Sequence, residues 1–485
     1  MKFNLKDYLK LSLLYTFAAS FPALLQIFIL PIIEGEGRLG AVDFSQMAIS
    51  ESISTFVGTF ILFSMTSAIS RFYYDYIENK KGIATMFSSI LLGIIFRGLI
   101  VFGVAIILGD YVASFFTQPE LHNFSTYGYG AIGIGINRAI IIAATTLYRN
   151  QKIVSRFIII NILTALLRST GQLIGIFCFD MSFAGYVNGA AIGGGVVTVA
   201  VIIFTFAQSG IHYSRATMKP IVRFVLPLFI FEVVKWGVLF ADRFFMESTP
   251  EQLGIYDNAQ RFAAGIYIIF QGLYGAVQPD FFHYLQIGIK ESISDLRRLA
   301  NIYMLQAQIA ALGLIIPVII YIHFFFETSL TTSATLIAII FAQYIITAVN
   351  TIFSLPIIYN KRTDIFLVIN LFVLAISLTL NYLLIPKFGY YGAIFASYTA
   401  NLTQLALLVF FQNQIIKIKW NYKKSVATPL LIVIFAILTE VLKNIFDLNY
   451  LLMSFVFIGL SGFIILLQYK KEATHFIFKY LKVKG

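Results

Sequence analysis

Charged residues are scarce in this chain. They make up 12% of its 485 residues, against about 25% in an ordinary soluble domain, whereas hydrophobic residues make up 59% and the mean hydropathy is +0.84. This composition excludes a soluble globular protein and indicates a membrane protein. Cysteine occurs once, as Cys178, which excludes an intramolecular disulfide. We expect Cys178 to be a small buried apolar residue.

The chain also has few of the sequence motifs that are typical of enzymes. Its five histidines do not stand at the spacing of metal ligands, and there is no phosphate-binding G-x-x-x-x-G-K-[ST] loop. A glycosyltransferase or polymerase would need a sizeable polar loop with catalytic carboxylates. The longest polar connection, at 278–300, is interpreted instead as a cytoplasmic interfacial segment. We therefore expect no enzyme, no metal and no other cofactor.

Long apolar runs dominate the sequence. A helix that spans a bilayer needs about 20 mainly apolar residues, so these runs predict an all-α polytopic membrane protein with about fourteen transmembrane helices. The fourteen stretches lie at 9–33, 44–69, 85–108, 126–147, 154–178, 184–208, 222–241, 256–278, 301–322, 333–358, 365–385, 390–414, 426–441 and 450–468.

Cations are distributed unevenly between these stretches. The two ends of the chain and every second connection carry 26 lysines and arginines, from Lys2 to Lys482 and Lys484, whereas the intervening connections carry four. Cytoplasmic loops are enriched in Lys and Arg, so this alternation predicts that both termini are cytoplasmic. The net charge of +12 is thus explained by topology and by attraction to anionic lipids, and we expect no nucleic-acid partner.

One short pattern occurs twice. Residues 39–46 read LGAVDFSQ and residues 253–260 read LGIYDNAQ, an offset of 214. At similar offsets, INIL at 160–163 is followed by INLF at 369–372, and NGAAI at 188–192 by YGAIF at 391–395. We interpret the pattern mainly as a mark of duplication, in which the glycine forms a turn and the aspartate caps the next helix.

The repeat predicts the domain organisation. It relates helices 1–6 to helices 7–12, and because six is even the two copies form a parallel repeat with a substrate cleft between them. We expect pseudo-symmetric six-helix lobes at 1–210 and 211–416, followed by helices 13 and 14 and a cytoplasmic tail at 417–485. These last two helices either complete the packing or form a lateral surface for a lipid tail.

Charge within a membrane helix is costly and indicates function. Arg97, Arg138 and Arg168 lie far from the ends of helices 3, 4 and 5, where snorkelling to the surface is difficult. We expect these three arginines to face a water-filled central cavity. Their guanidinium groups are suited to binding phosphate through paired hydrogen bonds.

Four other charged residues lie in the predicted helices. Lys235 follows Glu232 by three residues, so the two share a helix face and are expected to pair, although Lys235 is also a candidate substrate ligand. Glu51 and Arg261 lie near the outer surface, which their side chains reach by snorkelling.

Polar side chains form stripes on three helices. Such stripes either line a binding site or join helices by hydrogen bonds. With the arginines, they suit a ligand that has an anionic end and a hydroxyl-rich remainder. The stripes are Asn161, Thr164, Arg168 and Gln172 in helix 5, Gln343, Thr347, Asn350 and Ser354 in helix 10, and Ser397, Asn401 and Gln404 in helix 12. Glycines 189 and 193 form G-x-x-x-G, which we expect to allow close helix packing.

The segment 223–263 resembles the middle of bacterial polysaccharide flippases of the O-antigen, Wzx type. In that family, a seventh helix with a proline near its start ends in D-R-[FLY] and is followed by a short loop and L-G-x-Y. The matching residues are Pro227, Asp242, Arg243, Phe244, Leu253, Gly254 and Tyr256. AISRFYYD at 68–75 and LYRNQKI at 147–153 are similar to cytoplasmic helix ends of the same family.

The resemblance implies a member of the multidrug/oligosaccharidyl-lipid/polysaccharide (MOP) exporter superfamily. Its implied function is to move an undecaprenyl-diphosphate-linked oligosaccharide from the inner to the outer leaflet of the bacterial cytoplasmic membrane by alternating access. The implied partners are this lipid-linked glycan, membrane lipids, and the glycan polymerase and glycosyltransferases of the same pathway.

Two sister families are alternatives. Multidrug extruders place an acidic residue in helix 1, but 9–33 contain none; lipid II flippases depend on arginines in helices 1 and 2, and here only Arg71 ends helix 2. The energy source stays open between the membrane potential, worth about 2.3 kcal/mol per charge per 100 mV, and a coupled proton or sodium ion. Candidate coupling or gating residues are Glu51, Glu232, Asp242, Arg243 and Arg261.

Overall fold

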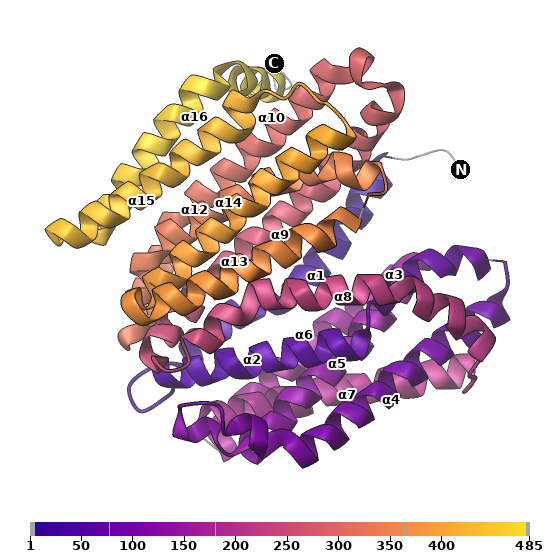
Figure 1. The fold of residues 1–485 in the computed structure, drawn as a ribbon. Helices are drawn as coiled ribbons and strands as arrows, with labels where there is room; N and C mark the ends of the chain where they lie inside the picture. The colour runs from indigo at the N-terminus through magenta and orange to yellow at the C-terminus, as the bar shows by residue number, and fades with distance from the viewer. Residues whose placement is uncertain (1–4, 77, 180, 363, 482–485) are drawn as a thin grey trace. The chain divides into compact units, whose positions relative to one another are not determined.

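The computed structural model describes residues 5–76, 78–179, 181–362 and 364–481, and the described chain is helical throughout apart from its connections (Figure 1). Lys2, Lys482 and Lys484, which contribute to the charge bias, lie outside the described residues. The helices are α1 (Leu5–Ile33), α2 (Ala41–Leu62), α3 (Met65–Phe72), α4 (Lys80–Ala113), α5 (Phe124–Asn150), α6 (Val154–Ile174), α7 (Phe183–Ser209), α8 (Arg215–Phe245), α9 (Pro250–Ile287), α10 (Ile289–Gly313), α11 (Ile315–Phe325), α12 (Ile337–Tyr359), α13 (Asp364–Phe388), α14 (Tyr390–Ile415), α15 (Thr428–Phe446) and α16 (Tyr450–Leu481). Short 3₁₀ or π turns are η1 (Tyr73–Tyr76), η2 (Pro119–Leu121), η3 (Gly175–Phe179), η4 (Ser329–Leu336) and η5 (Lys423–Ala427).

The prediction of an all-α membrane protein is confirmed. Each of the fourteen apolar stretches coincides with one helix or with two consecutive helices, because in a bilayer only a helix satisfies its own backbone groups. Within the described residues, 12 helical segments are long and apolar enough to cross a membrane. The sidedness of the termini stays a prediction.

The chain divides into two compact units. Unit 1 comprises the described residues up to Asp257 together with the short segment Glu327–Ser329, and unit 2 comprises Asn258–Phe326 and the described residues from Leu330 on. In unit 1, α8 packs against α2, α3 and α4. The lobe boundaries that the repeat predicts, at 210/211 and 416/417, stay a prediction.

Equivalent helix pairs are joined in the two units. In unit 1, the Asn137 side chain in α5 donates to the Ala191 carbonyl in α7 at 2.8 Å, and in unit 2 the Gln343 side chain in α12 donates to the Ser397 hydroxyl in α14. In both bonds the partners are 54 residues apart. A parallel duplication that relates α5 to α12 and α7 to α14 would produce this pattern.

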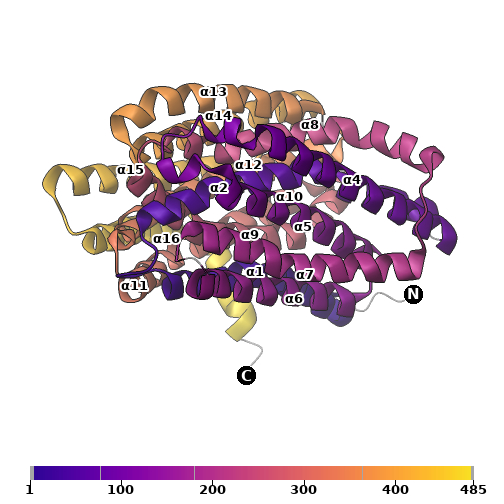
Figure 2. The same ribbon diagram turned by 90° about the horizontal axis from the view of Figure 1, so that it is seen from below.

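Helices α6 and α7 lie side by side along their length (Figures 1 and 2). A Cβ atom added at Gly189 in α7 would lie 2.0 Å from the Gly171 carbonyl oxygen in α6, and one at Gly193 would lie 2.1 Å from that of Leu167. The prediction that Gly189 and Gly193 allow close helix packing is confirmed.

The second predicted span is broken. Between α2 and α3, Phe63 and Ser64 have φ angles of 52° and 53°, the left-handed conformation that costs a non-glycine residue free energy. The break leaves backbone groups at the end of α2 without helical partners. Such breaks at membrane depth are tolerated only inside protein or beside a water-filled cavity.

Residues 278–300 are almost wholly helical, because α9 continues to Ile287 and α10 begins after a single residue, Gly288, whose φ is 122°; their interfacial position stays a prediction. Two details of the sequence-based picture are wrong. Helix α9 begins at Pro250 rather than near residue 256. Cys178 is exposed, because it lies in the π turn η3 at the end of α6.

Gly189 offers a direct test of the α6–α7 contact. In Gly189→Val the added carbons would overlap the Gly171 backbone, so the helices must separate; overpacking of this kind costs about 1–3 kcal/mol. We expect a lower melting temperature in detergent. The control is Gly103→Ala in α4, where nothing lies within 4 Å of the added Cβ atom, and its stability should be unchanged or slightly higher. Equal melting temperatures for Gly189→Val and the parent protein would contradict the close contact.

Candidate functional site

Arg97, in α4, lies at the break in the second span. Its Nε donates to the Ile61 carbonyl oxygen at 2.7 Å, and its guanidinium carbon lies 5.4 Å from the centre of the Phe63 ring. A cation near a helix C-terminus is favourable because the free carbonyls carry negative partial charge. Arg97 therefore stabilises the broken end of α2, while its Nη2 is buried without a hydrogen-bond partner.

Arg138, in α5, lies farther toward the start of α2. Its Nη1 donates to the Thr55 hydroxyl at 2.9 Å. Thr55 and Ile61 are six residues apart, so the two arginines contact α2 at levels separated by about 9 Å along the helix axis. The charged neighbours of Arg138 are Glu51 in α2 and Arg168 in α6. Glu51 and Arg168 are thus near enough to Arg138 to act on it electrostatically.

The polar stripe of α6 contains buried groups without partners. Thr164 Oγ1, Arg168 Nε and Gln172 Nε2 are buried and make no hydrogen bond to the described residues. Gln172 Oε1 accepts a bond of 2.8 Å from Gln26 in α1, and Gln26 in turn accepts one of 2.7 Å from the Tyr186 hydroxyl in α7. The fourth member of the stripe, Asn161, donates to the Phe157 carbonyl in its own helix at 2.8 Å.

Positive charge predominates in this part of unit 1. Among the described residues, no carboxylate lies within 4 Å of the guanidinium groups of Arg97, Arg138 or Arg168. Glu51 is the one acidic neighbour of Arg138 that the described residues include. Unpaired charge and unsatisfied donors away from water are costly, and an anionic ligand would supply both the charge and the acceptors that these groups lack.

The predicted pair in α8 forms. Lys235 Nζ lies 4.0 Å from Glu232 Oε2, and both side chains are more than two-fifths exposed. Half-exposed ion pairs contribute little to stability. The pair therefore neutralises itself.

The polar stripes of the tenth and twelfth predicted helices, which are α12 and α14 in the structure, form hydrogen bonds with each other in unit 2. Besides the Gln343–Ser397 bond, the Asn350 side chain in α12 donates to the Gln404 side chain in α14 at 2.8 Å and to the Asn401 carbonyl at 3.3 Å. Gln343 and Asn350 are buried. These side chains therefore join two helices, although Gln343 Oε1 and Asn350 Oδ1 have no partner among the described residues.

Asp242 and Arg243 belong to a compact network at the end of α8. Arg243 Nε donates to Asp257 Oδ1 at 2.9 Å, Arg243 Nη1 donates to Asp242 Oδ1 at 3.2 Å, and the Tyr256 hydroxyl donates to Asp242 Oδ2 at 2.6 Å. The guanidinium also lies over the Phe240 ring. The D-R and L-G-x-Y motifs that carry the family resemblance are thus bonded to each other. Arg261, one turn farther along α9, is partly buried.

The two aspartates of the repeated pattern have different roles. Asp43 Oδ2 accepts from the Gly40 N–H at 3.0 Å at the start of α2, so the capping prediction is confirmed there. It is wrong for Asp257, which lies two turns inside α9 and pairs with Arg243. The turn predicted at Gly254 is also wrong, because this glycine is helical and a Cβ atom on it would lie 1.9 Å from the Ala41 carbonyl oxygen. The two copies of the pattern therefore touch.

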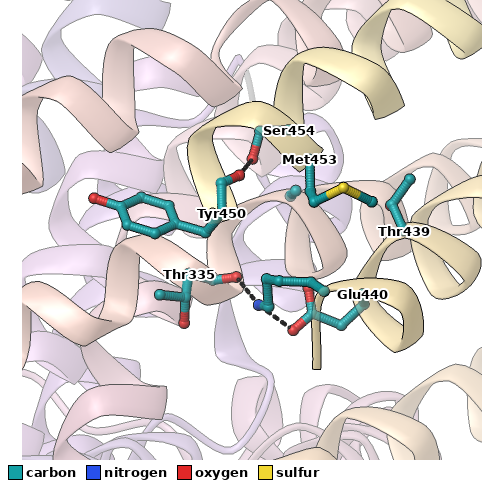
Figure 3. Close-up of a pocket in the computed structure, with 8 residues that line it drawn as sticks. Thr335, Thr439, Glu440, Tyr450, Met453 and Ser454 are labelled. Carbon is teal, nitrogen blue, oxygen red and sulfur yellow. Dashed lines mark hydrogen bonds and ion pairs between the residues drawn. The ribbon is translucent and has the colours of Figure 1, made fainter. Parts of the chain in front are cut away.

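A buried ion pair in unit 2 was missed in the sequence analysis. Lys443 Nζ lies 2.5 Å from Glu440 Oε1 and donates to the Thr335 carbonyl at 3.1 Å, and both side chains are about nine-tenths buried in a small recess (Figure 3). The Tyr391 hydroxyl donates to Glu440 at 2.7 Å. The spacing of three residues between Glu440 and Lys443 was the available signal, but the predicted span 426–441 ends before Lys443, which was counted with the following connection.

The described residues contain no group of three or more His, Cys, Asp or Glu side chains that could hold a metal ion. The site offers positively charged guanidinium groups together with buried hydroxyl and amide groups.

The Glu440–Lys443 pair predicts a distinct stability pattern. Lys443→Met leaves a buried carboxylate unpaired, which costs about 3–5 kcal/mol, whereas Glu440→Gln combined with Lys443→Met removes both charges and recovers most of the loss. Thermal unfolding in detergent measures both variants, with Lys387→Met as a control at an exposed lysine. A double variant as unstable as Lys443→Met would contradict the pairing.

The described chain is a polytopic membrane protein whose fold is similar to that of transporters of the MOP superfamily. The lipid II flippase MurJ in an inward closed conformation aligns with 95% of this chain and 100% of its own at a TM-score of 0.67 and 15% identity. An inward-facing multidrug resistance transporter of the MATE family aligns with 81% of this chain and 98% of its own, at a TM-score of 0.60 and 13% identity.

A third solved structure is a MOP superfamily transporter from Pyrococcus furiosus, described as having a binding pocket of reverse polarity that suggests a different function. It aligns with 83% of this chain and 96% of its own, at a TM-score of 0.57 and 13% identity. No protein-family model and no curated protein matches the chain. The solved structures that share the fold are transporters, not enzymes.

Proposed function

We propose that this chain is a flippase that moves a polyprenyl-diphosphate-linked oligosaccharide from the inner to the outer leaflet of the bacterial cytoplasmic membrane. The observation that carries the proposal is the group of arginines in unit 1 that no carboxylate within 4 Å neutralises, with buried donors left free at Arg97 and Arg168. A diphosphate is the ligand that this arrangement suits, because guanidinium binds phosphate through strong, charge-assisted hydrogen bonds.

In this proposal, the residues bind different parts of the substrate. Arg138 and Arg168 bind the diphosphate, and the neighbouring Thr164 and Gln172 offer hydrogen bonds to the adjoining phosphate or sugar. Arg97 holds the broken end of α2 and directs one free N–H group to the same ligand. The polyprenyl tail stays in the bilayer, where it loses no apolar contact.

The energetics allow this cycle without ATP. Moving one charge through 100 mV is worth about 2.3 kcal/mol, so a dianion that leaves a negative interior gains roughly 4–5 kcal/mol. Glu51, beside Arg138, is the acidic residue best placed to couple a proton or sodium ion to anion release. Substrate cations, such as those of a multidrug exporter, would be repelled by the same arginines.

The proposal is tested with Arg138→Ala and Arg168→Ala in proteoliposomes that contain a fluorescent polyprenyl-diphosphate glycan. Each variant loses charge-assisted hydrogen bonds worth about 1.5–3 kcal/mol, so we expect transport to fall about 10- to 100-fold at subsaturating substrate. Arg138→Lys and Arg168→Lys keep the charge and should retain part of the activity.

The matched control is Arg362→Ala, which removes an exposed arginine that pairs with Asp364. It should transport at the parent rate. Parent rates for both Arg138→Ala and Arg168→Ala at normal protein levels would overturn the proposal. Arg97 is unsuited to this comparison, because its replacement also frees the Ile61 carbonyl at the helix break.

The same vesicles distinguish between the substrates of related transporters. We expect the diphosphate-linked glycan to cross and a cationic dye to remain. Lipid II, which also carries a diphosphate, serves as the competing substrate: inhibition of glycan flipping without lipid II crossing would indicate that the sugar part decides transport. Exclusive transport of the dye would show that the chain is a multidrug exporter instead.

A further inference from the structure

Two buried glutamates hold chain segments that are remote in sequence. Glu34 follows directly after α1 and is fully buried. Its carboxylate accepts hydrogen bonds from the Glu327 N–H at 2.9 Å, from the Thr328 N–H at 2.7 Å and from the Thr328 hydroxyl. All these residues belong to unit 1.

Glu247 makes the same contact elsewhere in unit 1. It lies two residues after the end of α8 and is 4% exposed. Its carboxylate accepts from the Thr117 N–H at 2.9 Å, from the Thr117 hydroxyl at 2.8 Å and from the Gln118 N–H at 2.8 Å. Each glutamate thus binds two successive backbone N–H groups and one threonine hydroxyl.

The two contacts are related by the internal repeat. Glu34 and Glu247 differ by 213 in residue number, and Thr117 and Glu327 differ by 210, close to the offset of 214 between the repeated L-G-x-x-D-x-x-Q patterns. Under that repeat, the end of α1 corresponds to the end of α8. The segment after α4 corresponds to the segment after α11. Glu34, in the first half of the repeat, therefore binds residues 327–328 of the second half. Glu247, in the second half, binds the equivalent residues 117–118 of the first half.

Carboxylates are well suited to contacts that must open. All the hydrogen bonds of each glutamate go to one short segment, so they break together. Once separated, the carboxylate and the N–H groups are satisfied by water, because a hydrogen bond in a protein largely replaces one to solvent. An apolar contact in the same place would be penalised on exposure. Both the closed and the open arrangement are thus low in free energy, as a two-state switch requires.

We propose that Glu34 and Glu247 are paired latches, which hold the outer ends of α1 and α8 in the arrangement seen here and release when the substrate path opens outward. The assignment to the outer side follows from the distribution of cations along the chain, and the inference rests on the proposed transport function. Arg38 reinforces the first latch, because its Nη2 lies 3.4 Å from Glu327 Oε2. Gln118 reinforces the second by donating to the Glu247 carbonyl at 3.0 Å.

The first test measures opening without any substrate. Cys178→Ser removes the single native thiol, and Leu39→Cys or Leu121→Cys then introduces a buried reporter beside each latch. In Glu34→Gln and Glu247→Gln, the amide group places a donor against backbone donors. We expect labelling of the nearby reporter by an impermeant maleimide, in right-side-out vesicles, to rise by about tenfold or more, the change that corresponds to about 1.4 kcal/mol.

Glu36→Gln and Glu251→Gln are matched controls, because these glutamates are exposed and lie close to the latches in sequence. They should leave labelling unchanged. Unchanged labelling in both Glu34→Gln and Glu247→Gln would overturn the latch proposal, whatever the substrate is.

The second test prevents release. Cysteine pairs at 34 and 328, and at 117 and 247, are joined by a short thiol crosslinker, which should block glycan flipping until a reductant cleaves it. Full transport in a completely crosslinked protein would show that the latches need not open. If the parent protein does not flip the glycan at all, the proposed function fails. The latch proposal is then decided by the labelling experiment alone.

Discussion

Backbone groups inside a bilayer have no water to bind, and this constraint determines the structure more than any single contact. The described chain meets it with helices, and where one helix is broken another part of the chain supplies the missing partner. At Phe63 and Ser64 the second span leaves its helical path, and Arg97 from α4 binds the Ile61 carbonyl there. The connection between α4 and α5 is likewise held by Glu247, which binds the free N–H groups of Thr117 and Gln118. Buried arginine and glutamate are thus needed where helices end or bend.

The helices could be predicted from the sequence, and so could those side-chain pairs that depend on helical spacing alone. Fourteen apolar stretches correspond to the observed helices because length and hydropathy decide whether a segment spans a membrane. Glu232 and Lys235 pair because three residues make almost one turn. The helix break at Phe63 and the partner of Arg97 could not be predicted, since neither residue at the break is glycine or proline and Ile61 is 36 residues away.

The repeated pattern shows that identical residues can have different structural roles in its two copies. Asp43 caps α2 because that helix begins two residues earlier, whereas Asp257 lies inside α9 because that helix begins at Pro250. Proline is favoured at the first position of a helix, and with this signal the earlier start could have been predicted. The changed register frees Asp257 to bind Arg243 and brings Gly254 against the Ala41 carbonyl. The two copies of the pattern thus contact each other instead of forming two equivalent turns.

The sign of the charge in this part of unit 1 is the feature on which the proposed function rests. A lipid II flippase and a multidrug transporter both align with this chain, so the fold alone cannot decide the substrate. In unit 1, Arg138 and Arg168 lie near one acidic side chain, Glu51, whereas in unit 2 the buried Glu440 and Lys443 pair with each other. If the arginines served only to stabilise the fold, paired or apolar residues would do so at lower free energy. Under the proposed function, an anion that binds during the transport cycle would compensate these charges.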